Sequence, residues 1–231
     1  MKQGILWLVI VFAASTLCAQ SFTNLGFERA RAVPDNRSEV VVAQVLPGWT
    51  PYMVAPDFPF GVGVLYNNVC IGSPCISVFG PKRTAIQFDF VVQPAEGKFC
   101  VGLDKGSGLT VEIGLRQTGF IPATAKSLFI TASDTPTIRL NDSSLAPVLF
   151  ASPENPNHAG GISPKGIWGF DVSPFSGQTA TLTVANSDFR FMTIDALNFS
   201  SVTVVPEPST ITLAGLGLAM LLGFRSGQIP R

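Results

Sequence analysis

The chain has 231 residues, of which 13% are charged, and its 15 basic and 15 acidic residues cancel to zero net charge. A typical soluble domain carries about 25% charged residues, whereas here Gly (22), Pro (18) and Phe (18) are plentiful. The length fits one domain plus targeting segments, the composition favours a β-rich extracellular module, and the balanced charge excludes the basic surface that nucleic-acid binding needs.

The first 19 residues have the three parts of a secretory signal peptide. Lys2 supplies the positive charge, and Ile5–Ala14 (ILWLVIVFAA) supplies an uninterrupted apolar core. Small and weakly polar residues follow, so we expect export by the Sec pathway and cleavage after Ala19. Cys18 allows a lipoprotein alternative, but Leu17 stands where that signal needs a small residue. An uncleaved membrane helix is disfavoured because the run is too short to span comfortably.

Residues 20–204 alternate apolar and polar positions in short runs separated by turn formers, a pattern typical of half-buried strands. The clearest expected strands are Ile86–Phe90, Phe99–Leu103, Leu109–Ile113, Ser127–Ala132, Thr137–Asn141, Ile167–Val172, Thr179–Val184 and Met192–Phe199. No stretch has a convincing helical period. Many short strands predict an all-β domain built as a two-sheet sandwich.

Two segments near the start of this domain, Asn24–Glu28 (NLGFE) and Pro47–Trp49 (PGW), resemble the opening of galactose-binding-like jelly-roll domains. The later segments Ile167–Ser173, 177–179 and Ile194–Phe199 are similar to the closing strands of that fold. The resemblance implies a two-sheet jelly-roll sandwich over residues 20–204.

In similar jelly rolls, the opening glutamate and an aspartate of the penultimate strand often meet at a structural Ca2+. Glu28 and Asp195 occupy those places. A hard cation needs several oxygen ligands, so the resemblance implies a calcium site that supports the scaffold rather than catalysis. The alternative is that Glu28 caps a turn or is solvated and that Asp195 satisfies a turn.

Aromatic side chains are dense between Pro47 and Asn68, a segment whose composition predicts a loop. They are Trp49, Tyr52, Phe58, Phe60 and Tyr66. Exposed aromatic rings can stack on sugars, and Tyr52 and Tyr66 are the preferred candidates because Trp49 and Trp168 more often pack in jelly-roll cores. The alternative is a hydrophobic cap over one end of the sandwich.

Three cysteines remain after the signal peptide, which leaves one unpaired if a disulfide forms. Cys70 and Cys75 flank an Ile-Gly-Ser-Pro turn and are the simplest pair in an oxidising compartment. Cys100 lies in an expected strand and could instead capture either partner. A metal site is disfavoured because the chain has one His and the two cysteines have a C-x4-C spacing.

Recognised catalytic motifs are missing: the sequence has no Gly-x-Ser-x-Gly elbow, no His-Glu-x-x-His and no phosphate-binding Gly-x-x-x-x-Gly-Lys. The single histidine, His158, lies in a segment with loop composition. The carboxylates that could be considered for a glycosidase pair are Glu96, Glu112, Asp134 and Glu154. Nothing in their spacing favours two of them, so we expect a protein that is not an enzyme.

The last segment, 205–231, has three parts: Pro206-Glu207-Pro208, an apolar run to Phe224, and Arg225. The two prolines cannot continue a helix, so a helix is expected over about 209–224. At about 1.5 Å per residue it reaches most of the way across a hydrocarbon core of about 30 Å, with Arg225 on the cytoplasmic side. A buried amphipathic helix is disfavoured because the run has no polar face.

This order resembles the PEP-CTERM sorting signal of Gram-negative bacteria, which an exosortase (a membrane-embedded cysteine protease or transpeptidase) recognises. The resemblance implies export, transient inner-membrane anchoring, then processing and release to the cell surface or extracellular matrix. Pro206, Glu207 and Pro208 would be the recognition residues and Arg225 the stop-transfer charge. The family usually ends in a tight Arg cluster, whereas here Ser-Gly-Gln-Ile-Pro separates Arg225 from Arg231.

Three hypotheses follow. The first is a noncatalytic surface or matrix protein, sorted by an exosortase, with a structural or adhesive role. The second is a carbohydrate-binding module for exopolysaccharide or other glycans, and the third is a hydrolase with unrecognised carboxylates.

Overall fold

The computed structural model of the protein describes residues 20–31, 40–55, 62–70, 72–80, 84–85, 90–106, 111–151, 166–188 and 191–204. The expected signal peptide (1–19) and tail (205–231), with Pro206, Glu207, Pro208 and Arg225, lie outside these ranges and stay predictions. Within the described ranges, no helix is both long and apolar enough to cross a bilayer.

Nearly all regular structure in the described chain is β strand. The elements are α1 (Val42–Val45), β1 (Thr50–Val54), β2 (Gly63–Tyr66), β3 (Cys75–Phe79), β4 (Thr84–Ala85), β5 (Phe90–Val91), β6 (Cys100–Asp104), β7 (Glu112–Phe120), β8 (Ser127–Ala132), β9 (Thr137–Leu140), β10 (Ser143–Ser144), β11 (Val148–Ala151), β12 (Gly166–Asp171), η1 (Ser173–Phe175), β13 (Thr179–Asn186) and β14 (Phe191–Ser200). The two helices span four and three residues, so the expected all-β class is confirmed for the described part.

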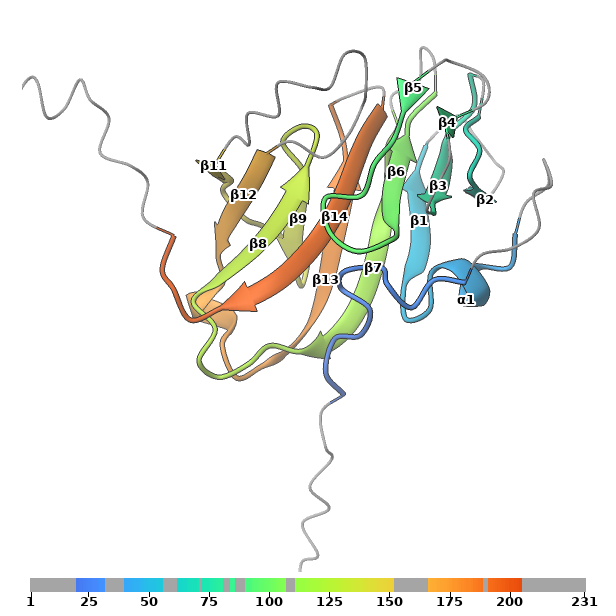
Figure 1. The fold of residues 1–231 in the computed structure, drawn as a ribbon. Helices are drawn as coiled ribbons and strands as arrows, with labels where there is room; N and C mark the ends of the chain where they lie inside the picture. Colours follow the sequence, from blue (N-terminus) through green and yellow to red (C-terminus); the bar gives the residue numbers. More distant parts are fainter. Residues whose placement is uncertain are drawn as a thin grey trace, which may run out of the picture.

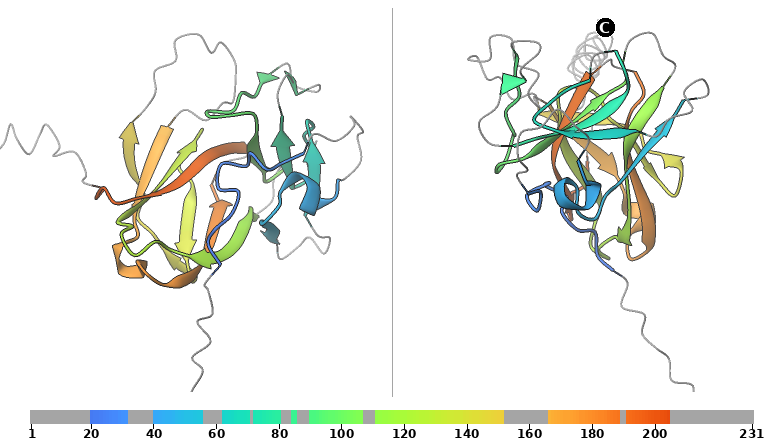
Figure 2. Two further views of the ribbon diagram at one scale, coloured as in Figure 1. Left: turned by 60° about the horizontal axis from the view of Figure 1, so that its bottom comes forward. Right: turned by 90° about the vertical axis from the view of Figure 1, so that its right-hand side faces the viewer.

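Two sheets face one another and form a sandwich (Figure 1, Figure 2). One sheet has five strands in the order β1-β7-β13-β9-β10, and the other has seven in the order β11-β12-β8-β14-β6-β3-β2. Among the described strands, β2 and β3 are paired in parallel and the other neighbours are antiparallel. The expected two-sheet sandwich is therefore confirmed.

Alternate side chains fill the space between the sheets, since successive residues of a strand point to opposite faces. On β7, Ile113 and Leu115 are fully buried and join the same core cluster as Ile130 of β8 in the other sheet. Glu112 and Arg116 occupy the opposite face of β7 and are only partly buried. On β7 the core thus takes the apolar half of the strand and leaves the outer face of the five-stranded sheet for polar groups.

The N-terminal segment, residues 20–31, lies beside β14. The backbone N–H of Leu197 donates to the carbonyl of Leu25 at 3.3 Å. A bulge interrupts the pairing of β14 with β8 just after Asp195, and Ala196 has a φ of 48° there. Bulges re-aim a side chain, and this one brings Asp195 toward the segment that carries Glu28.

One expectation about the fold is wrong: the segment from Pro47 to Asn68, predicted as a loop, contains β1 and β2. Each is an edge strand, β1 of the five-stranded sheet and β2 of the seven-stranded sheet. Pro51 lies within β1. Proline has no backbone N–H to donate, and an edge strand tolerates this because it has no partner strand on one side.

Candidate functional site

Tyr52 lies on the outer face of the five-stranded sheet, on edge strand β1. Its Cα partner on β7 is Gly114. A Cβ built on Gly114 would lie 2.7 Å from Tyr52 Cε1, so the half-buried ring uses the space that a side chain would take. A Cβ there would also lie 2.3 Å from the carbonyl oxygen of Val184, so replacing this glycine would disturb both the tyrosine and the neighbouring strand β13.

Glu112 is the centre of a polar cluster on the same face. Its Oε1 accepts hydrogen bonds from Tyr52 Oη and Arg139 Nη1, both at 2.7 Å, and its Oε2 accepts from Ser187 Oγ at 2.9 Å and from Arg139 Nη2. The Arg139 contact is a two-pronged ion pair, the strongest geometry for these groups.

The hydrogen bonds from Arg139, and then from Tyr52 and Ser187, hold the pKa of Glu112 near 2 against the opposing effect of burial. Burial and the nearby Glu112 carboxylate raise the pKa of Tyr52. Near neutral pH the cluster therefore consists of a charged carboxylate, a charged guanidinium and a neutral phenol. Both Glu112 oxygens are already hydrogen-bonded, which makes this carboxylate a poor proton acceptor.

Arg116 stacks on Tyr52 without joining the ion pair. Its Cζ lies 4.0 Å from the centre of the Tyr52 ring, a cation–π arrangement. Its Nε is buried and has no hydrogen-bond partner, and no described carboxylate pairs with its charge. Within the described part of the chain, the guanidinium is therefore oriented by the tyrosine and has no carboxylate partner.

Thr183 lies between the two arginines on this face. Its Cα partners are Arg116 on β7 and Arg139 on β9. The residue is 1% exposed, and its hydroxyl has no hydrogen-bond partner. Buried polar groups are normally satisfied, so the hydroxyl of Thr183 is an unmet hydrogen-bonding position next to an unpaired charge.

Tyr66, the second residue expected to stack on sugars, is buried in the core with 5% exposure. It lies on β2, in the seven-stranded sheet, whereas Tyr52 lies in the five-stranded sheet. A Cβ on Gly80 would lie 2.3 Å from the Tyr66 hydroxyl oxygen, so this end of the side chain is also enclosed. The expectation of a shared platform is wrong, because the side chain of Tyr66 faces the sandwich interior.

Glu28 and Asp195, expected to share a calcium ion, are brought to one loop. Asp195 Oδ2 accepts from the backbone N–H groups of residues 95 and 96 at 2.8 and 3.0 Å. Glu28 Oε1 accepts from those of residues 98 and 99 at 2.8 and 3.0 Å. Between these pairs, Gly97 has a φ of +62°, and a Cβ there would lie 2.3 Å from Glu28 Cδ. The loop thus closes around two carboxylates.

Asp195 is fully buried, while Glu28 is exposed. Burial, with a smaller contribution from the charge of Glu28, raises the pKa of Asp195 to about 6 against the hydrogen bonds from the loop. Burial, followed by the charges of Asp195 and Glu28, also raises the pKa of the buried thiol of Cys100. Among the described residues, no Lys or Arg pairs with either carboxylate, and no three His, Cys, Asp or Glu side chains gather as metal ligands.

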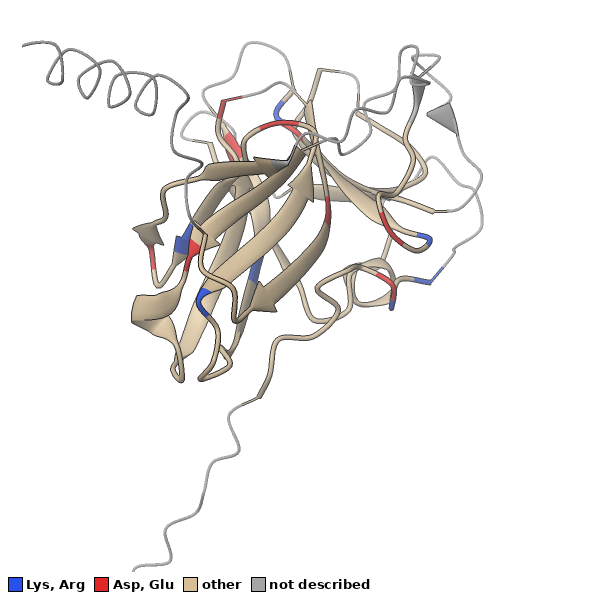
Figure 3. Cartoon of the chain, turned by 60° about the vertical axis from the view of Figure 1, so that its left-hand side comes forward, with Lys and Arg blue, Asp and Glu red and all other residues tan. Residues whose placement is uncertain are grey.

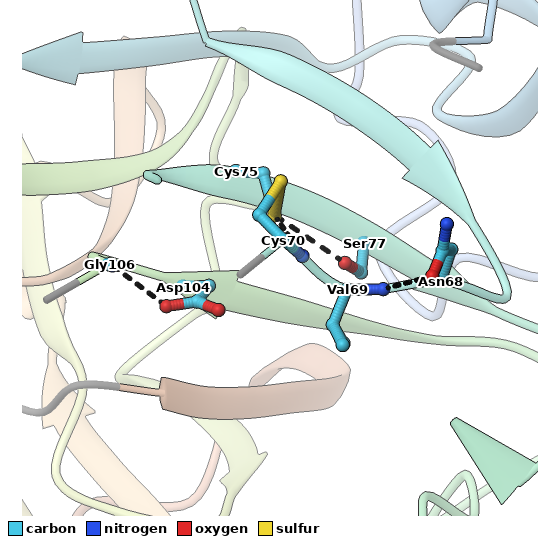
Figure 4. Close-up of a disulfide and its surroundings, with 7 residues drawn as sticks. All are labelled: Asn68, Val69, Cys70, Cys75, Ser77, Asp104 and Gly106. Carbon is cyan, nitrogen blue, oxygen red and sulfur yellow. Dashed lines mark hydrogen bonds between the residues drawn. A yellow bond between two sulfur atoms is a disulfide. The ribbon is translucent and has the colours of Figure 1, made fainter. Parts of the chain in front are cut away.

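The structure joins Cys70 and Cys75 by a disulfide, with Cα atoms 6.1 Å apart, and leaves Cys100 buried and free. Figure 4 shows the disulfide beside β3 and β6, where Cys75 pairs with Asp104. The Asp104 carboxylate accepts from the N–H of Gly106 at 2.8 Å. The bridge thus stabilises the end of the β3–β6 pair.

The two segments that resemble a jelly-roll opening, Asn24–Glu28 and Pro47–Trp49, are in contact. Trp49 is buried, its Nε1 donates to the carbonyl of Asn24 at 3.0 Å, and its ring centre lies 5.8 Å from that of Phe27. Trp168 is half-buried and packs against the core. Phe58, Phe60, His158 and Glu154 lie outside the described residues.

Sequence reasoning missed the residues that make the outer face distinctive, namely Arg116, Arg139 and Thr183. Charged positions are few along the described chain (Figure 3). The alternation of Glu112, Gly114 and Arg116 along β7 is the one available signal, because it places a carboxylate and an arginine on one face. Their partners come from other strands and depend on sheet register.

Comparison with known families adds one match. Residues 204–226 match the family model of the PEP-CTERM protein-sorting motif. The motif directly follows the sandwich and includes Pro206, Glu207, Pro208 and Arg225. It implies an exported protein that crosses a membrane in a Gram-negative bacterium and has an exosortase as its processing partner.

No curated protein matches the chain. Among solved structures, the Stig cyclase Fisc from Fischerella sp. TAU, in complex with (3Z)-3-(1-methyl-2-pyrrolidinylidene)-3H-indole, is 16% identical, with a TM-score of 0.44, over 78% of this chain and 94% of that one. The enzymatically active domain of tailspike protein 4 of bacteriophage CBA120 is 13% identical, with a TM-score of 0.31, over 66% and 19%. Likeness at these scores does not bear on activity.

Proposed function

We propose that the protein is a noncatalytic surface or extracellular-matrix protein, exported by the Sec pathway, anchored transiently in the inner membrane, and released after exosortase processing. The observation that carries the proposal is the sorting motif at residues 204–226, directly after the sandwich. In this proposal residues 1–19 are removed as a signal peptide, residues 20–204 are a galactose-binding-like jelly roll, and a helix over about 209–224 holds the tail in the membrane.

The polar cluster around Glu112 supports a structural role. Glu112 is held as a charged carboxylate near pKa 2, with both oxygens bonded to Arg139 and to neighbouring hydroxyls. Such a cluster ties β1, β7 and β9 together across the sheet. It offers no free base near neutral pH, whereas a hydrolase needs one carboxylate available to transfer a proton.

Localisation tests this function. The full chain and a variant with Pro206, Glu207 and Pro208 replaced by Ala are expressed in a Gram-negative host with its exosortase, and in the same host without it. The intact motif with exosortase should place the protein in the surface or matrix fraction, and the other three combinations should leave it in the inner-membrane fraction. Equal surface delivery in all four would contradict the proposal, and polysaccharide turnover by the purified protein would favour a hydrolase.

A carbohydrate-binding module is the second candidate, favoured by the outer face of the five-stranded sheet. Tyr52 and Arg116 there combine an aromatic ring and a guanidinium that pairs with no described carboxylate. Glycan sites combine aromatic surface with a few precisely placed polar groups. Exopolysaccharide is the ligand expected near the cell surface, and binding that is lost in Tyr52→Ala would support this role.

A structural Ca2+ is proposed at Glu28 and Asp195. Two carboxylates face one loop without a described basic side chain to balance them, which suits a hard cation. Backbone carbonyl oxygens or waters would complete the ligand set. The ion would fix the loop around Gly97 to the N-terminal segment and to β14.

A further inference from the structure

We propose that residues 201–204, which join the sandwich to the sorting motif, must detach from the seven-stranded sheet before an exosortase can process the chain. These residues are called the exit segment below. The folded domain would then limit the rate of its own release. The inference rests on the proposed sorting function and adds a step to it.

The backbone of the exit segment is held by two neighbouring strands. The carbonyl oxygen of Val202 accepts a hydrogen bond from Ser127 Oγ at 2.6 Å, and the N–H of Val202 donates to Ser200 Oγ at 3.1 Å. Ser127 is the first residue of β8 and Ser200 is the last residue of β14, and the two are direct partners in the sheet. Figure 1 shows the exit segment, in red-orange, leaving the end of β14.

The side chain of Val204 packs at the far end of the exit segment. Val204 is 8% exposed. A Cβ built on Gly169 of β12 would lie 2.8 and 3.2 Å from the two methyl carbons of Val204 and 3.0 Å from Phe129 Cε1. Val204 therefore lies over the backbone of Gly169 and beside Phe129. The side chain of Val202, in contrast, is 59% exposed, so Val204 supplies the larger apolar contact.

The sorting motif begins where this packing ends. The family match starts at residue 204, and only Val205 separates the packed valine from Pro206. The membrane helix is expected from about residue 209, and residues 205–208 reach at most about 14 Å when fully extended. A membrane-embedded enzyme would have to bind the recognition residues within this short distance of the folded sandwich.

Detachment of the exit segment removes this obstruction. Proteolysis favours exposed segments whose backbone is not bonded to the rest of the fold. With residues 201–204 released, the free chain doubles in length and reaches about 28 Å. Local opening of this kind leaves the rest of a domain folded. When opening and closing are faster than cleavage, the rate of processing follows the fraction of molecules that are open.

Pulse labelling of the full chain, in a Gram-negative host that has an exosortase, measures the rate of processing. Ser127→Ala and Val204→Ser each remove one contact of the exit segment and should raise the rate about threefold or more. Val202→Ser is the matched control, since it makes the same change at an exposed valine, and it should leave the rate unchanged.

An insertion variant separates detachment from recognition of residue 204 by the enzyme. Gly-Ser-Thr-Val inserted after Val204 leaves the packed valine in place and restores the same Thr-Val pair before Val205. This variant removes no contact, yet it should also be processed about threefold faster or more, because the motif no longer adjoins the sheet. Val204→Ser in the insertion variant should give no further acceleration.

Three results would overturn the inference. The first is an equal rate for the wild type and the insertion variant, and the second is equal acceleration by Val202→Ser and Val204→Ser. The third is an effect of Val204→Ser that persists in full after the insertion. A wild-type chain that is not processed at all would instead remove the sorting function itself. Thermal unfolding of each full-length variant shows whether a substitution loosens the whole sandwich, and acceleration in the insertion variant supports the inference even where one does.

Discussion

Glu28 and Asp195, from opposite ends of the domain, hold the two halves of one loop through hydrogen bonds from its backbone. Glu28 comes from the N-terminal segment and Asp195 from the bulge in β14. The loop leads directly into β6, so three distant parts of the chain depend on two carboxylates. The two carboxylates thus connect the N-terminal segment and β14 to the loop before β6.

Gly97→Ala should destabilise the protein because the new Cβ would lie 2.3 Å from Glu28 Cδ and the residue has a φ of +62°. We expect the free energy of unfolding to fall by about 1–3 kcal/mol. Gly26→Ala is the matched control, since a Cβ there meets nothing within 4 Å. Chemical denaturation measures both, and equal stability of the two variants would contradict the close contact between Gly97 and the Glu28 carboxylate.

Asp195 predicts a pH dependence of stability when divalent ions are chelated. The pKa of its carboxyl is about 6 in the folded state and about 3.9 in the unfolded chain. Between these values the folded state binds more protons, so the stability due to Asp195 falls as pH rises through this window, by on the order of 3 kcal/mol. Asp195→Asn should lack this fall. If the free energies of unfolding of the variant and the wild type changed with pH in the same way between about pH 4 and about pH 7, this prediction would be contradicted.

Calcium should reverse the loss of stability that accompanies ionisation of Asp195. A cation at Glu28 and Asp195 favours the ionised carboxylates, so added Ca2+ should raise the unfolding temperature near neutral pH and have less effect well below the Asp195 pKa of about 6. Differential scanning calorimetry with Ca2+ or a chelator measures this effect. The stabilisation should disappear in Glu28→Gln combined with Asp195→Asn. Equal stabilisation in wild type and double variant would place the ion elsewhere.

Glu112→Gln should remove the ion pair with Arg139 and reduce the free energy of unfolding by about 1–3 kcal/mol, because a partly buried guanidinium loses its partner. The folded pKa of Glu112 is near 2, below its unfolded value of about 4.3. Its stabilisation is therefore present above the unfolded value and is lost as pH falls toward the folded one. Glu96→Gln, at an exposed side chain, is the control, and equal loss in both variants would contradict the central place of Glu112.

Much of the sandwich can be predicted from alternation alone. The expected strand Ser127–Ala132 coincides with β8, and Thr179–Val184 lies within β13, because each has one buried apolar face. The strand β3 (Cys75–Phe79) escapes detection because all five of its residues are buried and no polar face produces a period of two. The edge strand β1 is hidden by its proline and by its glycine-rich and proline-rich neighbours.

The contacts within the candidate site are harder to predict from the sequence than the strands. Tyr52 can be selected as an aromatic residue, but its contacts with Glu112 and Arg116 arise from the register of β1 against β7. Tyr66 has the same composition around it and yet points inward, because side-chain direction depends on which face of its strand meets the core. Glu28 and Asp195 were found by resemblance to a known fold, and no local pattern links them.

The most direct test of the sorting account is the intact mass of the mature protein, isolated from the surface or matrix fraction of its own host. The account predicts a chain without residues 1–19 whose C-terminus ends at or near Pro206–Pro208, and without the apolar run that follows. A surface-located chain that continues through Arg231 would contradict it.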